Sequence, residues 1–354
     1  MIDSLLTKAV EYRNIDLAKY FLEIGADPNP FGALYHAVKI DRIDLVNLLL
    51  KYDANPNVYY DYCVPLVTAA FWGYKDIVKI LLDHGADTNI KDHSGWAPLP
   101  QAITWKHFNI AKILIESGAE VNIYDQDNNT PLILAAMEGN IKIVNLLLKK
   151  GARTDIKNAQ MNTALHYASM NGNIEIVKEL LSYNASVDLR NIDGDIPLGL
   201  ASCYGHHVIV RMLLKKCTTP DWCSVREYYI FLYVISEGYI EVFKALLEHE
   251  PNLCNAKVEE ERATALMLAL ASENIELVKI LLQYNPDLNI QTTTGETALH
   301  LAVELGDLEI VEMLVRKGAN IYTTNKDGIS PLSYARYNNL KVMQILLKYG
   351  RTLD

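Results

Sequence analysis

Cationic residues and long apolar runs are both scarce in this sequence of 354 residues. It has 33 lysines and arginines against 43 aspartates and glutamates, for a net charge of −10. A nucleic-acid binder or a basic membrane-surface protein needs a cationic face, so we expect no nucleic-acid partner. The longest apolar run, residues 228–235, is far shorter than the roughly 18 residues of a membrane helix, so we expect no membrane insertion.

Cysteine is also infrequent, and we expect no secretion signal. The five cysteines are scattered and odd in number, which excludes a disulfide-dense scaffold and is typical of a reducing compartment. The opening residues, MIDSLLTKAVEYR, have no basic stretch followed by an apolar core. We therefore predict a cytoplasmic location.

What the sequence does contain is one short segment that returns about every 33 residues. It reads TPLILA from Thr130, TALHYA from Thr163 and TALHLA from Thr297. Other copies include VPLVTA, APLPQA, IPLGLA, TALMLA and SPLSYA, and three copies are degenerate. The eleven segments start near residues 4, 32, 64, 97, 130, 163, 196, 229, 264, 297 and 330.

Each segment is followed by a second pattern with helical periodicity. From Lys142 it reads KIVNLLLKKGARTD, in which the apolar residues recur at the spacing of one buried helix face. Gly151 then supplies a residue that tolerates the left-handed conformation at a helix end. Each unit is therefore predicted to be helix, turn, helix and a turn-bearing loop.

This eleven-fold pattern resembles the ankyrin-repeat family, over essentially the whole chain. The resemblance implies an all-α solenoid of stacked helix-turn-helix units with β-hairpin fingers. We expect a single repeat domain over residues 1–354, with the first and last units acting as caps that have more polar outer faces. The length alone would have suggested two or three globular domains.

Two places depart from the pattern. The first two segments are only 28 residues apart, so the first finger, at Pro28 to Pro30, is predicted to be a tight loop without a hairpin. Residues 217–262 contain CTTPD in place of the usual GADxN-like turn and an acidic run, Glu259 to Glu261. This region is either a hinge of low stability or a merely divergent repeat.

No catalytic or metal motif stands out from the repeats. The sequence has no P-loop, GxSxG or HExxH pattern, so we predict no enzymatic activity, no cofactor and no metal. A zinc site was considered for Cys203, His206, His207, Cys217 and Cys223, but their spacings match no standard site. His166 and His300 fall at the fourth position of their segments, where the family pattern implies that the ring bonds backbone groups of the turn.

Function in a repeat array depends on exposed residues that the fold does not need. In the ankyrin pattern these lie near the end of each first helix and on the fingers. Aromatic and methionine residues gather there, with Tyr59 and Tyr62 on one finger; the residues predicted to bind a partner are Phe31, Tyr60, Phe71, Trp72, Trp96, Trp105, Met137, Met170 and Tyr204. They are either partner anchors or rings that pack on the neighbouring repeat.

We therefore predict a non-enzymatic, monomeric protein-protein interaction module that binds a protein through its concave groove and fingers. A narrower alternative is an effector or host-range protein of an intracellular bacterium or virus, acting in the host cytoplasm on a host partner. The content of Asn, Ile, Lys and Tyr, which suits an AT-rich genome, favours that alternative. An enzyme subunit and a scaffold without a specific partner are two further alternatives.

Overall fold

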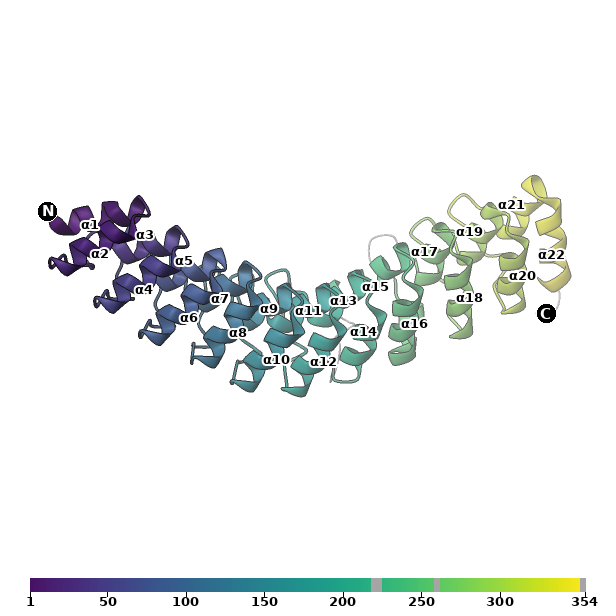
Figure 1. Ribbon diagram of the computed structural model, residues 1–354. Helices are drawn as coiled ribbons and strands as arrows, with labels where there is room; N and C mark the ends of the chain where they lie inside the picture. Colours follow the sequence, from purple (N-terminus) through teal and green to yellow (C-terminus); the bar gives the residue numbers. More distant parts are fainter. Residues whose placement is uncertain (218–224, 258–261, 351–354) are drawn as a thin grey trace. The chain divides into compact units, whose positions relative to one another are not determined.

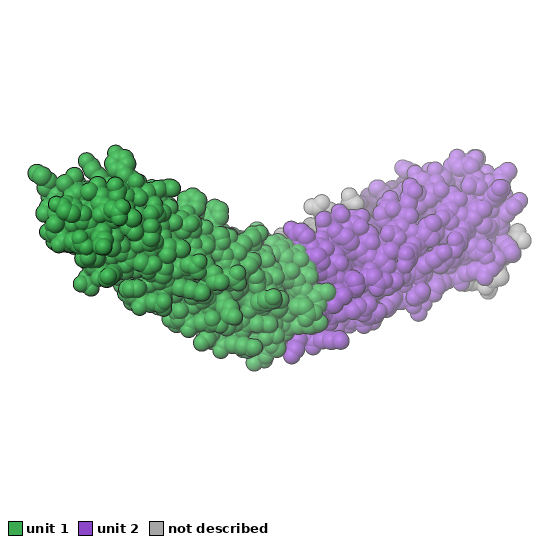
Figure 2. All heavy atoms as spheres, viewed as in Figure 1, with its two compact units in different colours: residues 1–197 green, residues 198–354 purple. Residues whose placement is uncertain are grey.

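A computed structural model describes residues 1–217, 225–257 and 262–350. These residues form 22 α-helices and one short 3-10 helix, and no strand is assigned among them. The all-helical architecture predicted from the repeats is confirmed. By chain contacts the molecule divides into two compact units, residues 1–197 and 198–354, which are coloured separately in Figure 2 and are described separately below.

Within each unit the helices come in pairs, with the odd-numbered helices in one row and the even-numbered helices in another (Figure 1). The first unit contains α1 (Ile2–Glu11), α2 (Ile15–Glu23), α3 (Ala33–Lys39), α4 (Ile43–Lys51), α5 (Pro65–Trp72), α6 (Lys75–Asp83), α7 (Pro98–Thr104), α8 (Phe108–Glu116), α9 (Pro131–Met137), α10 (Ile141–Lys149), α11 (Ala164–Met170) and α12 (Ile174–Ser182). The second contains α13 (Pro197–Cys203, beginning at the boundary), α14 (His207–Leu214), α15 (Val225–Ser236), α16 (Ile240–His249), η1 (Pro251–Asn255), α17 (Ala265–Ala271), α18 (Ile275–Gln283), α19 (Ala298–Leu305), α20 (Leu308–Arg316), α21 (Pro331–Asn338) and α22 (Leu340–Gly350).

The repeat around α9 and α10 shows why each segment folds as a helix pair. Thr130 caps α9 by accepting a hydrogen bond from the Ile133 N–H, and Pro131 occupies the first helical turn, where its missing N–H costs nothing. Gly139 lies between the helices with φ of 67°, and the Asn140 side chain caps α10 through the Ile143 N–H. The turn between the helices therefore depends on the positive φ of Gly139 and on the Asn140 cap.

The core is made by neighbouring repeats rather than within one repeat. α7, for example, packs on its own partner α8 and also on α5 and α9. Ile77 of α6 is 0% exposed, whereas Leu17, at the same position of the first described repeat, is 41% exposed because the described chain packs no further repeat against it. α1 and α2 also expose Leu5 and Tyr20, next to the charged and exposed Asp16, Lys19 and Glu23.

The fingers are tight turns rather than two-stranded hairpins in the part of the chain that the structure describes. Short backbone bonds close these turns, as from the Asp125 N–H to the Asn129 carbonyl at 3.1 Å and from the Asn128 N–H to the Asp125 carbonyl at 3.2 Å. Isolated bridges, such as that between Tyr60 and Cys63, take the place of the expected β-hairpin strands. Residues 26–32 of the first finger form only a bend and turns, as predicted.

Asparagine side chains join consecutive repeats at the loops that follow the even-numbered helices. The Asn57 Oδ1 accepts from the Asp87 N–H at 2.7 Å, and the Asn89 Oδ1 accepts from the Glu120 N–H at 2.7 Å. The same bond recurs in the second unit, where Asn289 accepts from the Asn320 N–H at 2.9 Å. Each oxygen satisfies a loop N–H that would otherwise lack a protein partner, and so fixes the register of two repeats.

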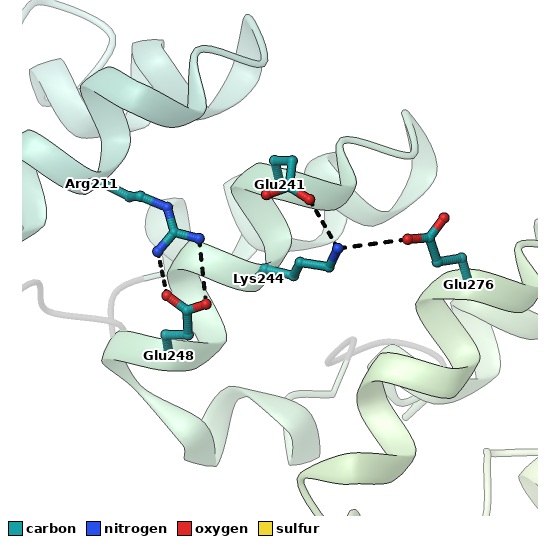
Figure 3. A network of polar contacts seen from close by, with 5 residues as sticks. All are labelled: Arg211, Glu241, Lys244, Glu248 and Glu276. Carbon is teal, nitrogen blue, oxygen red and sulfur yellow. Dashed lines mark hydrogen bonds and ion pairs between the residues drawn. The ribbon is translucent and has the colours of Figure 1, made fainter.

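Ion pairs link the even-numbered helices of the second unit (Figure 3). Arg211 of α14 forms a two-pronged contact with Glu248 of α16. Lys244 of α16 lies 2.9 Å from Glu241 and 3.6 Å from Glu276 of α18. These groups are largely in contact with water, so the pairs contribute little to stability.

The divergent region keeps the helix pair of a repeat. Phe231 of α15 and Phe243 of α16 are fully buried and stack with ring centroids 5.4 Å apart. Most of the CTTPD segment, residues 218–221, and Glu259 to Glu261 lie outside the described residues. The described helices of residues 217–262 thus keep the pairing of a repeat.

We expect Ile77→Ala to lower the free energy of unfolding by about 2–5 kcal/mol, because it empties a fully buried site between repeats. The matched variant Leu17→Ala removes a similar side chain at the same repeat position, which is already partly in water, and should cost much less. Urea unfolding followed by circular dichroism measures both. Equal losses would show that stacking of neighbours does not decide burial.

We expect Asn89→Ala to destabilise the protein by about 0.5–1.5 kcal/mol, because the Glu120 N–H exchanges its protein acceptor for water. Asn109→Ala, an exposed position on α8, is the control and should change stability by under about 0.5 kcal/mol. Thermal unfolding of the two variants compares them directly. An Asn89 variant as stable as the control would exclude a register role for these bonds.

Candidate protein-binding surface

Three aromatic rings from two adjacent repeats meet where α5 and α7 end. The Phe71 ring lies edge-to-face against Trp72, with centroids 5.0 Å apart, and against Trp105, with centroids 4.8 Å apart. Trp72 is 54% exposed and Trp105 is 51% exposed, while Phe71 is half-buried between them. We call these three residues the helix-end cluster.

His107, which the sequence analysis did not single out, supports the backbone of the helix-end cluster. His107 donates from Nε2 to the Phe71 carbonyl at 3.0 Å. Its ring also fills the space beside Gly73, where a Cβ would come within 2.6 Å of it. Gly73 has φ of 83°, so both its conformation and its missing side chain are required. Its position in the repeat could have identified His107, because it occupies the same repeat position as His206.

A second aromatic cluster lies on the fingers of the same repeats. His93 is placed edge-to-face against Tyr59 and Tyr62, with centroid distances of 5.1 and 5.2 Å. The backbone N–H of His93 donates to the Tyr62 carbonyl at 3.1 Å. The Tyr59 hydroxyl donates to the Lys91 carbonyl at 2.8 Å. All three rings are exposed. We call these residues the fingertip cluster; its tyrosines were noted in the sequence, but His93 was not.

The other predicted residues are scattered around these clusters. Phe31 is exposed, whereas Tyr60 is half-buried against Tyr35 and His36 and occupies the space above Gly32. Trp96 is half-buried, and its backbone N–H bonds to Asp92 at 2.9 Å.

The two predicted methionines and Tyr204 lie on other helices. Met137 is exposed at the end of α9, and Met170 is half-buried at the end of α11. Tyr204 is exposed but belongs to residues 198–354, the other unit. The structure thus brings together Phe71, Trp72 and Trp105. Tyr60 instead packs against residues of the preceding repeat.

His166 and His300 bond the turn backbone, as the family pattern implied. The Thr163 N–H donates to the His166 Nδ1 at 3.1 Å, which leaves Nε2 to donate to the Asp195 carbonyl at 3.2 Å. His300 repeats this arrangement with Thr297 and Ile329. Burial lowers the pKa of His166 to about 4, so the ring is neutral near pH 7.

Neither a metal cluster nor a membrane-length helix is found among the described residues. No three His, Cys, Asp or Glu side chains gather there in a way that could hold a metal ion. Cys223, one residue of the zinc alternative, lies outside that part of the chain. None of the described helices is long and apolar enough to cross a membrane.

Comparison with known proteins matches almost the whole chain to one family. The model of "Ankyrin repeats (3 copies)" matches overlapping segments, namely residues 34–125, 66–158, 120–191, 153–224, 198–292, 231–325 and 274–354. Ankyrin repeat protein FPV031 of fowlpox virus (strain NVSL) is 32% identical over 123 residues, which are 34% of this chain and 36% of that protein.

Two other relatives are much longer proteins. The human transient receptor potential cation channel subfamily A member 1 is 31% identical over 33% of this chain and 10% of its own length. The ankyrin repeat and KH domain-containing protein mask-1 of Caenorhabditis elegans is 32% identical over 26% of this chain and 4% of its own length. The matched segments therefore cover only a minor part of each relative.

The buried His166 predicts a pH dependence of stability. Its pKa is about 4 in the folded protein and about 6.5 when unfolded, so between these values the unfolded state binds the extra proton. Stability should therefore fall as the pH drops through this window, by up to about 3 kcal/mol from this group. In His166→Gln the fall should be smaller, while exposed His84→Gln should keep it. Urea titrations at pH 7, 5.5 and 4.5 measure this, and an unchanged slope in His166→Gln would contradict it.

Proposed function

This chain belongs to the ankyrin-repeat family, and from that premise we propose that it binds a protein partner through the exposed ends of its odd-numbered helices and its fingers. Ankyrin repeats are in general protein-protein interaction modules. The anchors are Phe71, Trp72 and Trp105. The module acts without catalysis, as a monomer in the cytoplasm.

One observation carries the proposal: two tryptophans leave about half of their surface in water at the helix-end cluster. The buried residues of α5 and α7, which fill the space between repeats, all come earlier in these helices than the two tryptophans. The exposed tryptophan rings are therefore not part of that packing. Tryptophan is enriched among the residues that dominate binding energy at protein interfaces. An exposed apolar cluster of this kind supports partner binding.

The cluster is also pre-organised, which favours binding. The edge-to-face contacts and the His107 bond fix the rings before a partner arrives, so little side-chain entropy is lost on association. Lys106 and Glu138, 2.8 Å apart beside Trp105, supply a polar rim. Met137 and Met170 are adaptable apolar side chains that extend the surface to later repeats. We assign Phe31, Tyr60 and Trp96 to the finger side of the same surface.

A narrower role is an effector or host-range protein that acts on a host partner. The similarity to a fowlpox virus ankyrin repeat protein over 34% of this chain favours this second candidate. The two proposals share the same surface and differ only in where the partner comes from.

Cross-linking coupled to mass spectrometry tests the binding surface. Purified wild-type protein should cross-link one specific partner, and Trp72→Ala combined with Trp105→Ala should reduce capture at least tenfold with the helical circular-dichroism signal intact. Tyr337→Ala, which removes an 85% exposed aromatic residue at the other end of the chain, is the matched control. Undiminished capture by the double variant would exclude the anchors.

A further inference from the structure

The finger loops of the second unit enclose an open recess of about 730 Å³. Its lining comes from the loop at residues 289–295, which precedes α19, and from residues 324–326, which precede α21. Lys257 and Arg262, before α17, complete the lining. Ligand sites in proteins usually have volumes of about 300–1,000 Å³. The recess is therefore large enough to take several side chains of a bound segment.

The charged residues that line this recess are all cationic. Lys257, Arg262 and Lys326 are exposed, and no aspartate or glutamate is among the described residues of the lining. In the part of the chain that the structure describes, none of the three forms an ion pair or a cation–π contact. The whole chain, by contrast, has 43 acidic residues against 33 lysines and arginines. The three positive charges are thus available to a ligand of opposite sign.

The carboxylates that are close to the recess in sequence do not line it in the described structure. Glu296 is half-buried, and its Oε2 accepts a hydrogen bond from the Thr294 hydroxyl at 3.4 Å. Asp327 is exposed, and Glu259 to Glu261 lie outside the described residues. A ligand in the recess therefore contacts cations directly, whereas Glu296 and Asp327 act on it at longer range, where salt screens their charge.

The two loops of the recess are fastened to each other before any ligand arrives. The Lys326 N–H donates to the Thr294 carbonyl at 2.9 Å, and the Gln291 Nε2 donates to the Thr324 carbonyl at 3.0 Å. Gly295 has φ of 85°, and a Cβ on it would lie 3.0 Å from the Lys326 nitrogen, so the loops meet backbone to backbone. A site fixed in this way loses little conformational entropy on binding.

The uncharged groups of the lining add hydrogen-bond donors. Thr293 and Thr324 contribute hydroxyl groups. The Asn289 Oδ1 is occupied by the Asn320 N–H at 2.9 Å, which leaves the side-chain N–H groups of Asn289 as donors. Ile290 is the one apolar side chain among the described lining residues. Because ionised carboxylates only accept hydrogen bonds and lysine and arginine only donate them, this lining is complementary to anionic oxygens.

We propose that this recess binds an acidic segment of a protein partner, whose carboxylates pair with Lys257, Arg262 and Lys326. Three cations from two fingers, around a space of about 730 Å³, suit a segment with several carboxylates better than one small anion. The site lies in the second unit and uses none of the aromatic anchors of the first unit. It is therefore a second binding surface, beyond the proposed function.

Short synthetic peptides test this site with the full-length protein. One peptide carries three glutamates separated by glycine and serine, and the second has glutamine in place of each glutamate. Binding is followed by fluorescence anisotropy of a label on the peptide. The glutamate peptide should bind about tenfold more tightly than the glutamine peptide, and its affinity should fall as salt is added, because the attraction is electrostatic.

Charge-removing variants locate the binding. Lys257→Gln/Lys326→Gln should weaken the glutamate peptide about tenfold, with the helical circular-dichroism signal intact. Lys341→Gln, which removes an exposed lysine of α22 outside the recess, is the matched control and should bind as the wild type does. Trp72→Ala/Trp105→Ala should also bind the glutamate peptide normally, so a failure of this site and a failure of the proposed function are seen separately.

Each contrary outcome would overturn a stated part of the inference. Equal binding of the glutamine peptide would exclude an acidic occupant, and undiminished binding by the lysine double variant would exclude this recess. Displacement by an equal concentration of inorganic phosphate would indicate a small-anion site and overturn the peptide segment. Changing Glu259 to Glu261 into glutamine removes only negative charge, so weaker binding by that variant, with its helical signal intact, would also contradict an anionic ligand.

Discussion

A helix pair of this protein cannot cover its own apolar face, and the rest of the architecture follows from that constraint. Burial is complete only where a repeat has a neighbour, as the contrast between Ile77 and Leu17 shows. The core is consequently a series of thin layers, each shared by two repeats. Polar bonds then set how the layers align: the asparagine oxygens bond the next loop, and His166 reaches the carbonyl of Asp195 in the following finger.

Because shared apolar layers form the core and polar bonds align the repeats, the ends of the odd-numbered helices stay outside the core. Their last residues are not needed for stacking, so they can be large and apolar without disturbing the fold. At α5 and α7 this position holds two tryptophans supported by His107, a residue that serves both stacking and the surface. The support explains how exposed rings keep a fixed arrangement in water.

The sequence was sufficient for the elements that depend on local chemistry. The period of 33, the caps such as Thr130 and the role of His166 all follow from residues close in the chain. It was insufficient where packing between repeats decides the outcome. Tyr60 and Trp72 look alike as exposed-position aromatics, but Tyr60 meets the bare backbone of Gly32 and packs there, whereas Trp72 has no such recess. The expected β-hairpins likewise depended on strand pairing, and turns closed by short-range backbone bonds replace it in the described fingers.

The contact between His107 and Phe71 joins residues only 36 positions apart, and Lys106 reaches no farther than Glu138. Contacts of such short range need little loop closure, so they form early and independently of distant chain. Everything that shapes the helix-end cluster therefore lies within residues 65–138. The described contacts that build this aromatic cluster thus all come from residues of the first unit, and none of them draws on residues 198–354.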